Sequence, residues 1–138
     1  MIGNNLTCLL IDDDADDQEI FRFALKKVDP SISCVVANDG VFALEKLFGT
    51  PQLQPLFIFI DINMPRVNGV QCLAEIKKRN ALDDIPIYMY STTWEEDIKK
   101  QCKKMGAVDF IVKSPSIADL ESTLTSILKQ LKSVSQSD

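Results

Sequence analysis

Histidine is absent from this sequence of 138 residues, and its four cysteines lie far apart, with no C-x-x-C pair. A catalytic site that pairs serine or cysteine with histidine is therefore excluded, and a zinc site built from Cys and His is not expected. Glycine is scarce, with five residues, and neither G-x-G-x-x-G nor G-x-x-x-x-G-K-[ST] occurs. The chain thus lacks the glycine-rich loops that bind nucleotide phosphates.

Long apolar runs and excess positive charge are also missing. No apolar run approaches the roughly 18 residues of a membrane-spanning helix, and no basic segment precedes an apolar one at the N-terminus. The net charge is −5, with 15 basic and 20 acidic residues, so we expect no direct DNA binding. These features predict a cytoplasmic protein with reduced cysteines and no membrane contact, folded as a single domain over residues 1–138.

Five short apolar runs alternate with five amphipathic segments along the chain. The runs at 6–11, 32–37, 56–60, 85–90 and 108–112 have the length and the Val, Ile and Phe content typical of strands. The segments that begin near residues 14, 39, 69, 94 and 117 carry apolar residues at helical spacing. This alternation predicts an α/β fold, a doubly wound five-stranded parallel sheet in a flavodoxin-like (βα)5 three-layer sandwich with strand order 2-1-3-4-5. We expect a core over about 6–131, a polar tail over 132–138 and no attached output domain.

Polar and charged residues stand where four of the predicted strands end. Six of the twenty acidic residues fall within 12–19, without any Lys or Arg among them. Ligands bind at the carboxyl ends of parallel strands, and strands 1, 3, 4 and 5 are neighbours in the predicted order. The residues expected to converge there are Asp12, Asp13, Asp61, Ser91 and Lys113.

Each of these residues has an ordinary explanation when it is considered alone. An acid after a strand is usually solvated or caps the next helix, and a lone lysine usually forms a surface ion pair. Three carboxylates that converge repel one another, so a cation or raised pKa values are expected. Oxygen ligands without His or Cys favour Mg²⁺ or a similar hard divalent ion. Asp61 stands alone on the central strand and is the natural nucleophile for an aspartyl-phosphate.

The motifs around these residues resemble those of the stand-alone, CheY-like receiver domains of two-component response regulators. The matching segments read LLIDDDAD, ANDGVFALEKL, FIDINMPRVNG, PIYMYST and GAVDFIVKS, and they cover roughly residues 6–131. The pattern D-x-x-M-P-x-x-x-G runs from Asp61 to Gly69, although its Met, Pro and Gly can also serve the turn alone. The resemblance implies a single receiver domain over 1–138 with the strand order given above.

The resemblance implies a role for each of the residues around the acceptor. Asp61 matches the phosphoacceptor and Lys113 the lysine that forms a salt bridge with the phosphoryl group. Ser91 matches the hydroxyl residue that moves toward that group. Phe110 matches the aromatic residue that changes rotamer with it, and a plain core role explains a phenylalanine in an apolar strand equally well.

The resemblance also implies Mg²⁺ as the cofactor. The matching ligands are Asp13, Asp61 and the backbone carbonyl of Asn63, while Asp12 matches an acid that acts mostly through metal-bound water. One position departs from the family pattern, in which proline commonly follows the lysine through a cis bond. Here Ser114 follows Lys113, and because a cis bond before a residue other than proline costs about 3 kcal/mol, either isomer is compatible with the sequence.

The resulting interpretation is a phosphoacceptor that receives its phosphoryl group from a phosphohistidine of a partner, a sensor histidine kinase or a histidine phosphotransfer protein. Phosphorylation would change the face formed by the fourth helix, the fifth strand and the fifth helix, which would then bind a target protein or a second copy of the chain. Such a protein is not an enzyme in the usual sense, although it catalyses its own phosphorylation and slow dephosphorylation. Two alternatives are a docking module that needs no phosphorylation and a small phosphatase or phosphotransferase that uses Asp61 on free substrates.

Overall fold

The five predicted strands form one parallel sheet in the order β2-β1-β3-β4-β5, which confirms the predicted topology. The computed structural model describes residues 6–49, 52–64, 68–79, 84–92, 95–113 and 116–136. The strands are β1 (Thr7–Ile11), β2 (Ser33–Ala37), β3 (Ile58–Asp61), β4 (Ile87–Ser91) and β5 (Asp109–Val112). Two strands reach one residue further than expected, because Asp61 pairs with Tyr90 and Ser91 pairs with Val112 in the sheet. Both polar residues are therefore fixed by the sheet itself.

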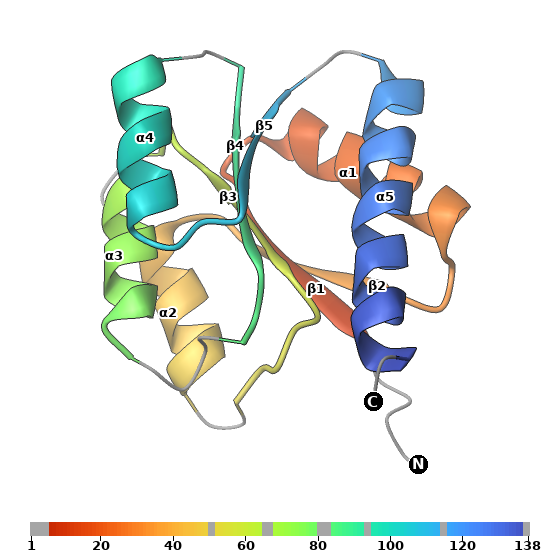
Figure 1. The fold of residues 1–138 in the computed structure, drawn as a ribbon, viewed down its shortest axis with the longest axis horizontal. Coiled ribbons are helices and arrows are strands. Elements are labelled where there is room, and N and C mark those ends of the chain that lie inside the picture. Colours follow the sequence, from red (N-terminus) through yellow and green to blue (C-terminus); the bar gives the residue numbers. More distant parts are fainter. Residues whose placement is uncertain are drawn as a thin grey trace.

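Helices cover both faces of the sheet, as the three-layer prediction requires. They are α1 (Ala15–Val28), α2 (Gly40–Phe48), α3 (Gly69–Lys77), α4 (Glu96–Lys104) and α5 (Ile117–Gln136). In Figure 1, α1 and α5 lie on one side of the sheet, and α2, α3 and α4 lie on the other. No helix within the described part of the chain is both long enough and apolar enough to span a membrane.

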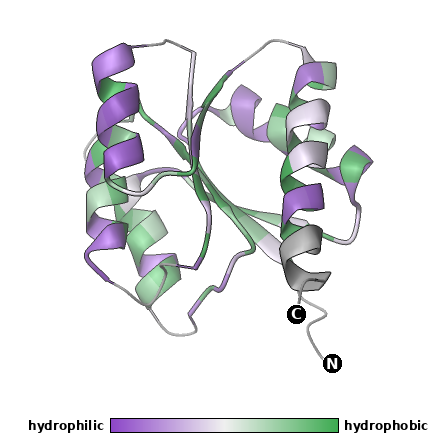
Figure 2. Ribbon diagram, viewed as in Figure 1, coloured by the Kyte–Doolittle hydropathy of each residue, from purple (hydrophilic) through white to green (hydrophobic). Residues whose placement is uncertain are grey.

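Two apolar cores stabilise the sandwich, one on each face of the sheet. Successive residues of β1 alternate between them, with Leu9 and Ile11 in the core under α2, α3 and α4 and Cys8 and Leu10 in the core under α1 and α5. Figure 2 shows mostly hydrophobic strands between helices that carry both hydrophilic and hydrophobic residues. All four cysteines are free thiols; Cys8, Cys72 and Cys102 are buried, whereas Cys34 is partly exposed.

Local capping explains where three of the helices begin. The carboxylates of Asp14 and Asp39 accept hydrogen bonds from the backbone N–H three residues later, at the starts of α1 and α2. Asn68 forms a reciprocal capping box with Gln71 at the start of α3. These caps place each helix directly after the loop that follows a strand.

Two helix boundaries differ from the predicted ones. α4 begins at Glu96, and Trp94, which the helical spacing assigned to it, lies outside the described residues. α5 continues to Gln136, so most of the expected polar tail over 132–138 is helical. Ser, Lys and Gln are compatible with a helix once the preceding turns are packed against the sheet.

Candidate functional site

Three aspartates meet at the carboxyl ends of β1 and β3. Asp12 follows β1 directly and Asp61 is the last residue of β3, and the register pairs Ile11 with Ile60 just below them. Oxygen atoms from Asp12, Asp13 and Asp61 all lie within 4.8 Å of one another. Asp12 is fully buried and Asp61 is 5% exposed, whereas Asp13 is exposed. The site therefore has a buried floor and one side open to solvent.

Lys113 supplies positive charge to this group from the end of β5. Its Nζ atom lies 2.9 Å from Oδ2 of Asp12 and 3.4 Å from Oδ2 of Asp61. The backbone N–H of Lys113 donates to the carbonyl of Ser91 over 2.7 Å, which extends the β4–β5 ladder to this residue. Ser114 and Pro115 lie outside the described residues. The question of a cis or trans Lys113–Ser114 bond therefore also lies outside them.

A fourth carboxylate, that of Asp17, belongs to the site and was missed by the sequence analysis. The sequence assigned Asp17 to the start of the first helix, and its backbone N–H does donate to the carboxylate of Asp14 over 3.0 Å. Its side chain, however, accepts a hydrogen bond of 2.7 Å from Nζ of Lys113. The two residues are 96 positions apart in the sequence, so the contact forms only in the folded chain.

The electrostatics of the site follow from burial and from this lysine. Burial raises the pKa of Asp61 to about 6; Lys113 opposes that rise, and the neighbouring charge of Asp12 adds to it. Burial likewise raises the pKa of Asp12, against the lowering effect of a backbone N–H and of Lys113. Burial alone would lower the pKa of Lys113, but the hydrogen bond to Asp17 and the nearby carboxylates of Asp12 and Asp61 raise it overall. The ammonium is thus firmly protonated between carboxylates that are costly to ionise together.

The donor set fits a hard divalent cation. Oδ2 of Asp12 is buried, and within the described ranges no hydrogen bond to it has good geometry, although the ammonium of Lys113 lies 2.9 Å away. The backbone N–H of Asn63 donates to Oδ1 of Asp61 over 3.2 Å, which brings the Asn63 segment against this carboxylate. Carboxylate oxygens with solvent on one side match the preference of Mg²⁺ for oxygen ligands and retained waters.

Ser91 and Phe110 lie on the face of the sheet that α4 covers. They line a cavity of about 30 Å³ together with Ile62, Asn63, Glu95 and Ile98. Ser91 is 1% exposed and Phe110 is 7% exposed, and Phe110 packs in the core under α2, α3 and α4. The cavity thus joins the acceptor loop to the two residues that the family resemblance singles out as moving.

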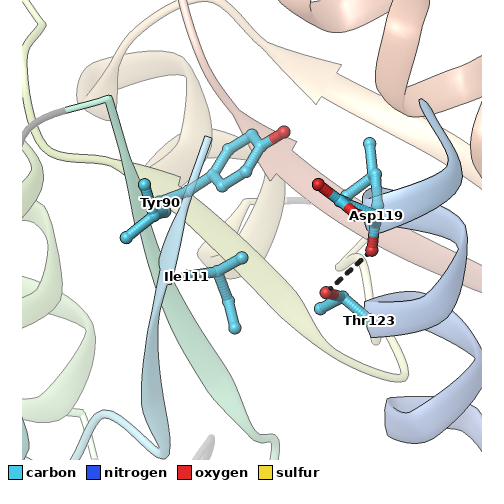
Figure 3. A pocket seen from close by; sticks show the side chains of 6 residues that line it. Tyr90, Ile111, Asp119 and Thr123 are labelled. Atoms are coloured by element: carbon cyan, nitrogen blue, oxygen red, sulfur yellow. Dashed lines mark hydrogen bonds between the residues drawn. The ribbon is translucent and has the colours of Figure 1, made fainter. Parts of the chain in front are cut away.

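Tyr90 lies on the opposite face of the sheet from Ser91. Its ring extends toward α5, where it lines a second cavity of about 20 Å³ together with Ile111, Asp119 and Thr123 (Figure 3). The ammonium of Lys113 lies 5.1 Å from the centre of this ring. Tyr90 therefore contributes a cation–π contact beneath the lysine that also contacts the aspartates.

Comparison with known proteins decides the family. A model of the response regulator receiver domain matches residues 8–125. The chain belongs to this family. Receiver domains bind Mg²⁺ at an acidic pocket and are phosphorylated by histidine kinases or phosphotransfer proteins. In this receiver domain the carboxylates that lie together are those of Asp12, Asp13 and Asp61.

Curated relatives include multidomain proteins. The receiver domain is 36% identical over 123 residues to a protein-glutamate methylesterase/protein-glutamine glutaminase of Hydrogenovibrio crunogenus, covering 87% of this chain and 30% of that protein. It is 33% identical over 124 residues to the protein of the same name from Treponema denticola, covering 82% of this chain and 32% of that protein. The chain spans about a third of the length of these relatives, so the single-domain arrangement over 1–138 stays a prediction.

Solved structures support the same family. The cyanobacterial phytochrome response regulator RcpA, in its phosphorylated form, superposes with a TM-score of 0.83 at 25% identity, covering 94% of this chain and 96% of that one. The Mn²⁺-bound form of response regulator Rcp1 superposes with a TM-score of 0.78 at 25% identity, covering 88% and 91%. The chemotaxis protein CheY4 of Vibrio cholerae shares the fold, with a TM-score of 0.77 at 24% identity and coverage of 88% and 98%.

Proposed function

We propose that this receiver domain accepts a phosphoryl group on Asp61, from a phosphohistidine of a sensor histidine kinase or a histidine phosphotransfer protein. The observation that carries the proposal is the contact between Lys113 and Asp61, a nearly buried carboxylate at the end of β3. Two further aspartates, Asp12 and Asp13, lie beside it. Because these 138 residues contain no histidine, the phosphohistidine of the proposed donor lies outside them. Two structural relatives support this chemistry, since the structure of RcpA is of its phosphorylated form and that of Rcp1 is of its Mn²⁺-bound form.

The transfer forms one bond and breaks one bond. A carboxylate oxygen of Asp61 attacks the phosphorus, a new O–P bond forms, and the P–N bond to the donor imidazole breaks with its electron pair going to the imidazole. Lys113 and the hydroxyl of Ser91 would hold the transferring oxygens. The proposed metal ligands are Asp12, Asp13, Asp61 and the backbone carbonyl of Asn63. A bound Mg²⁺ would neutralise charge that otherwise repels the incoming phosphoryl group.

Phosphorylation would be transmitted through the cavity beside Ser91. A shift of Ser91 toward the phosphoryl group enlarges the space that Phe110 lines, and a rotamer change of Phe110 then fills it. This change would alter the surface of α4, β5 and α5. Val108 and Val112 near β5 are 50% and 42% exposed, which supports this surface as the place where a target protein or a second copy binds.

Intact mass spectrometry tests the proposal. The protein is incubated with a small-molecule phosphodonor such as acetyl phosphate, with and without Mg²⁺, alongside the Asp61→Asn and Asp14→Asn variants. We expect one phosphoryl adduct on the wild type and on Asp14→Asn, dependent on Mg²⁺, and none on Asp61→Asn. An unmodified wild type would support a docking module that works without phosphorylation. Turnover of many equivalents of donor would instead support a small phosphatase.

A further inference from the structure

The contact between Asp17 and Lys113 gives the ammonium its one well-directed hydrogen bond to a carboxylate in the described structure. Nζ of Lys113 donates to Oδ2 of Asp17 over 2.7 Å, whereas its contacts with Asp12 and Asp61 are ionic contacts of 2.9 and 3.4 Å. The side chains of Lys113 and Asp17 are 9% and 30% exposed, so this contact is partly shielded from solvent. Hydrogen bonds between ionised partners are among the strongest in proteins.

We infer that Asp17 is a positioning residue, which orients the ammonium of Lys113 toward the acceptor. An ammonium has three N–H groups at fixed angles, and the bond to Asp17 uses one of them. The other two are left for the side of the ammonium that faces Asp12 and Asp61. This inference rests on the proposed function, in which Lys113 contacts the transferring phosphoryl oxygens.

Asp17 suits this task because it stands apart from the groups that change during the reaction. The oxygens that fit a cation come from Asp12, Asp13 and Asp61, and Asp17 is not among them. When Asp61 carries a phosphoryl group, its carboxylate has become part of a mixed carboxylic–phosphoric anhydride, and its attraction for the ammonium has changed. Asp17 is not chemically altered by that change, and α1 holds it in place by the hydrogen bond from its backbone to Asp14.

The ring of Tyr90 limits the movement of the Lys113 side chain on another side. The ammonium lies 5.1 Å from the ring centre, and Tyr90 itself is 4% exposed and fixed in β4. A lysine side chain has four rotatable bonds and loses much conformational freedom when it is held in one place. Asp17 and Tyr90 together restrict that freedom before any phosphodonor arrives, which lowers the barrier to transfer by pre-organisation.

Asp16 provides a matched control for Asp17. Both acids lie in the first turn of α1, so both interact with the positive end of the helix to a similar extent. Asp16 is exposed, whereas Asp17 contacts Lys113. The substitutions Asp16→Asn and Asp17→Asn therefore remove the same charge from the same turn, and only the second removes the contact.

Two measurements test the inference. The ¹⁵N signal of a lysine ammonium held by hydrogen bonds is visible by NMR because its protons exchange slowly; we expect this signal for Lys113 in the wild type and in Asp16→Asn, and its loss in Asp17→Asn. The rate of adduct formation from acetyl phosphate at saturating Mg²⁺ should fall about tenfold in Asp17→Asn, the effect of about 1.4 kcal/mol of lost transition-state stabilisation. Asp16→Asn should stay within about twofold of the wild type, and Asp17→Glu should recover part of the rate.

Each outcome bears on the inference. Equal rates for Asp17→Asn and Asp16→Asn, with both folded by circular dichroism, would overturn the positioning role. If the wild type forms no adduct, the proposed function fails, and the NMR signal alone decides whether Asp17 holds the ammonium. A Lys113 signal that persists unchanged in Asp17→Asn would overturn the inference in that case too.

Discussion

A Cβ atom on Gly69 would lie 2.4 Å from the backbone carbonyl oxygen of Asp61 and 2.6 Å from Cα of Ile62. The first residue of α3 is thus in direct backbone contact with the segment that carries the acceptor. The N–H of Gly69 also donates to the carbonyl of Ile62 over 2.9 Å. The glycine of the D-x-x-M-P-x-x-x-G pattern therefore serves this close approach, and it keeps the acceptor loop against the start of a helix.

The first prediction concerns this contact. Gly69→Ala should lower the free energy of unfolding by about 2 kcal/mol, because rigid backbone must move to admit the methyl group. The same shift should displace Asp61 and slow adduct formation. Gly106→Ala is the control: its φ of 110° makes it costly as well, but its Cβ would meet the flexible side chain of Lys77. Urea denaturation and the acetyl phosphate assay should show destabilisation in both variants and slow phosphorylation in Gly69→Ala alone.

The second prediction is a pH dependence of stability in the absence of divalent cations. The pKa of Asp61 is raised from 3.8 to about 6 in the folded protein. Because the folded state holds this proton more tightly than the unfolded state, the contribution of Asp61 to stability is full below about pH 4 and is lost as the pH rises through about 6. Asp61→Asn should therefore be more stable than the wild type at pH 7, by about 3 kcal/mol.

Urea denaturation in EDTA at pH 7 and at pH 4 measures this difference. The gain from Asp61→Asn should shrink to below about 1 kcal/mol at pH 4, where the carboxyl group is protonated in the folded state and about half protonated in the unfolded state. An equal gain at the two pH values would show that the amide stabilises the site for a reason other than charge.

The third prediction concerns removal of the ammonium. Lys113→Ala leaves the buried carboxylates of Asp12 and Asp61 without the cation that contacts them, and we expect a loss of about 3 kcal/mol in the free energy of unfolding at pH 7. The loss should shrink as the pH is lowered, because protonation relieves the repulsion. Lys103→Ala is a control in which an exposed lysine loses a loose contact of 3.9 Å with Asp109, and it should change stability little. If Lys113→Ala lowered the free energy of unfolding equally at pH 7 and pH 4, this account would be contradicted.

The fourth prediction concerns Mg²⁺. A cation that binds only the folded protein raises its stability, by about 2.7 kcal/mol at a concentration about 100 times its Kd. We expect the unfolding temperature of the wild type to rise on addition of Mg²⁺ and the rise to be lost on addition of EDTA. Asp13→Asn should abolish most of the shift, since Asp13 lies in the acidic group. Asp14→Asn should retain it, because asparagine caps a helix as well as aspartate does. A shift of equal size in both variants would place the cation elsewhere.

The fold was predictable from the sequence because each element carries a local signal. Apolar runs of strand length, caps such as Asp14 and Asp39, and the stop at Gly49 are readable without tertiary contacts, and the structure has them at or near the expected positions. The convergence of strand-end residues was predictable for a related reason. Parallel strands place their carboxyl ends on one edge of the sheet, so the order of the strands alone decides which of these residues meet.

Asp17 and the boundaries of two strands were not predictable in the same way. Asp17 has two uses, one through its backbone at the helix start and one through its side chain, and the spacing of apolar residues reports only the first. Its second use depends on how α1 is rotated relative to Lys113, which packing between distant parts of the chain determines. Asp61 and Ser91 likewise belong to β3 and β4 through pairing with a neighbouring strand, which composition alone does not report.

The separation of 96 residues between Asp17 and Lys113 has a consequence for biosynthesis. The ribosome completes the acidic end of the site long before it adds the lysine, so a nascent chain that lacks β5 carries the aspartates without their ammonium. Such a chain cannot present the acceptor together with Lys113, however well its first strands have formed. On the proposed function, competence to receive a phosphoryl group therefore arrives with the last strand, and we expect chains truncated before Lys113 not to react with the phosphodonor.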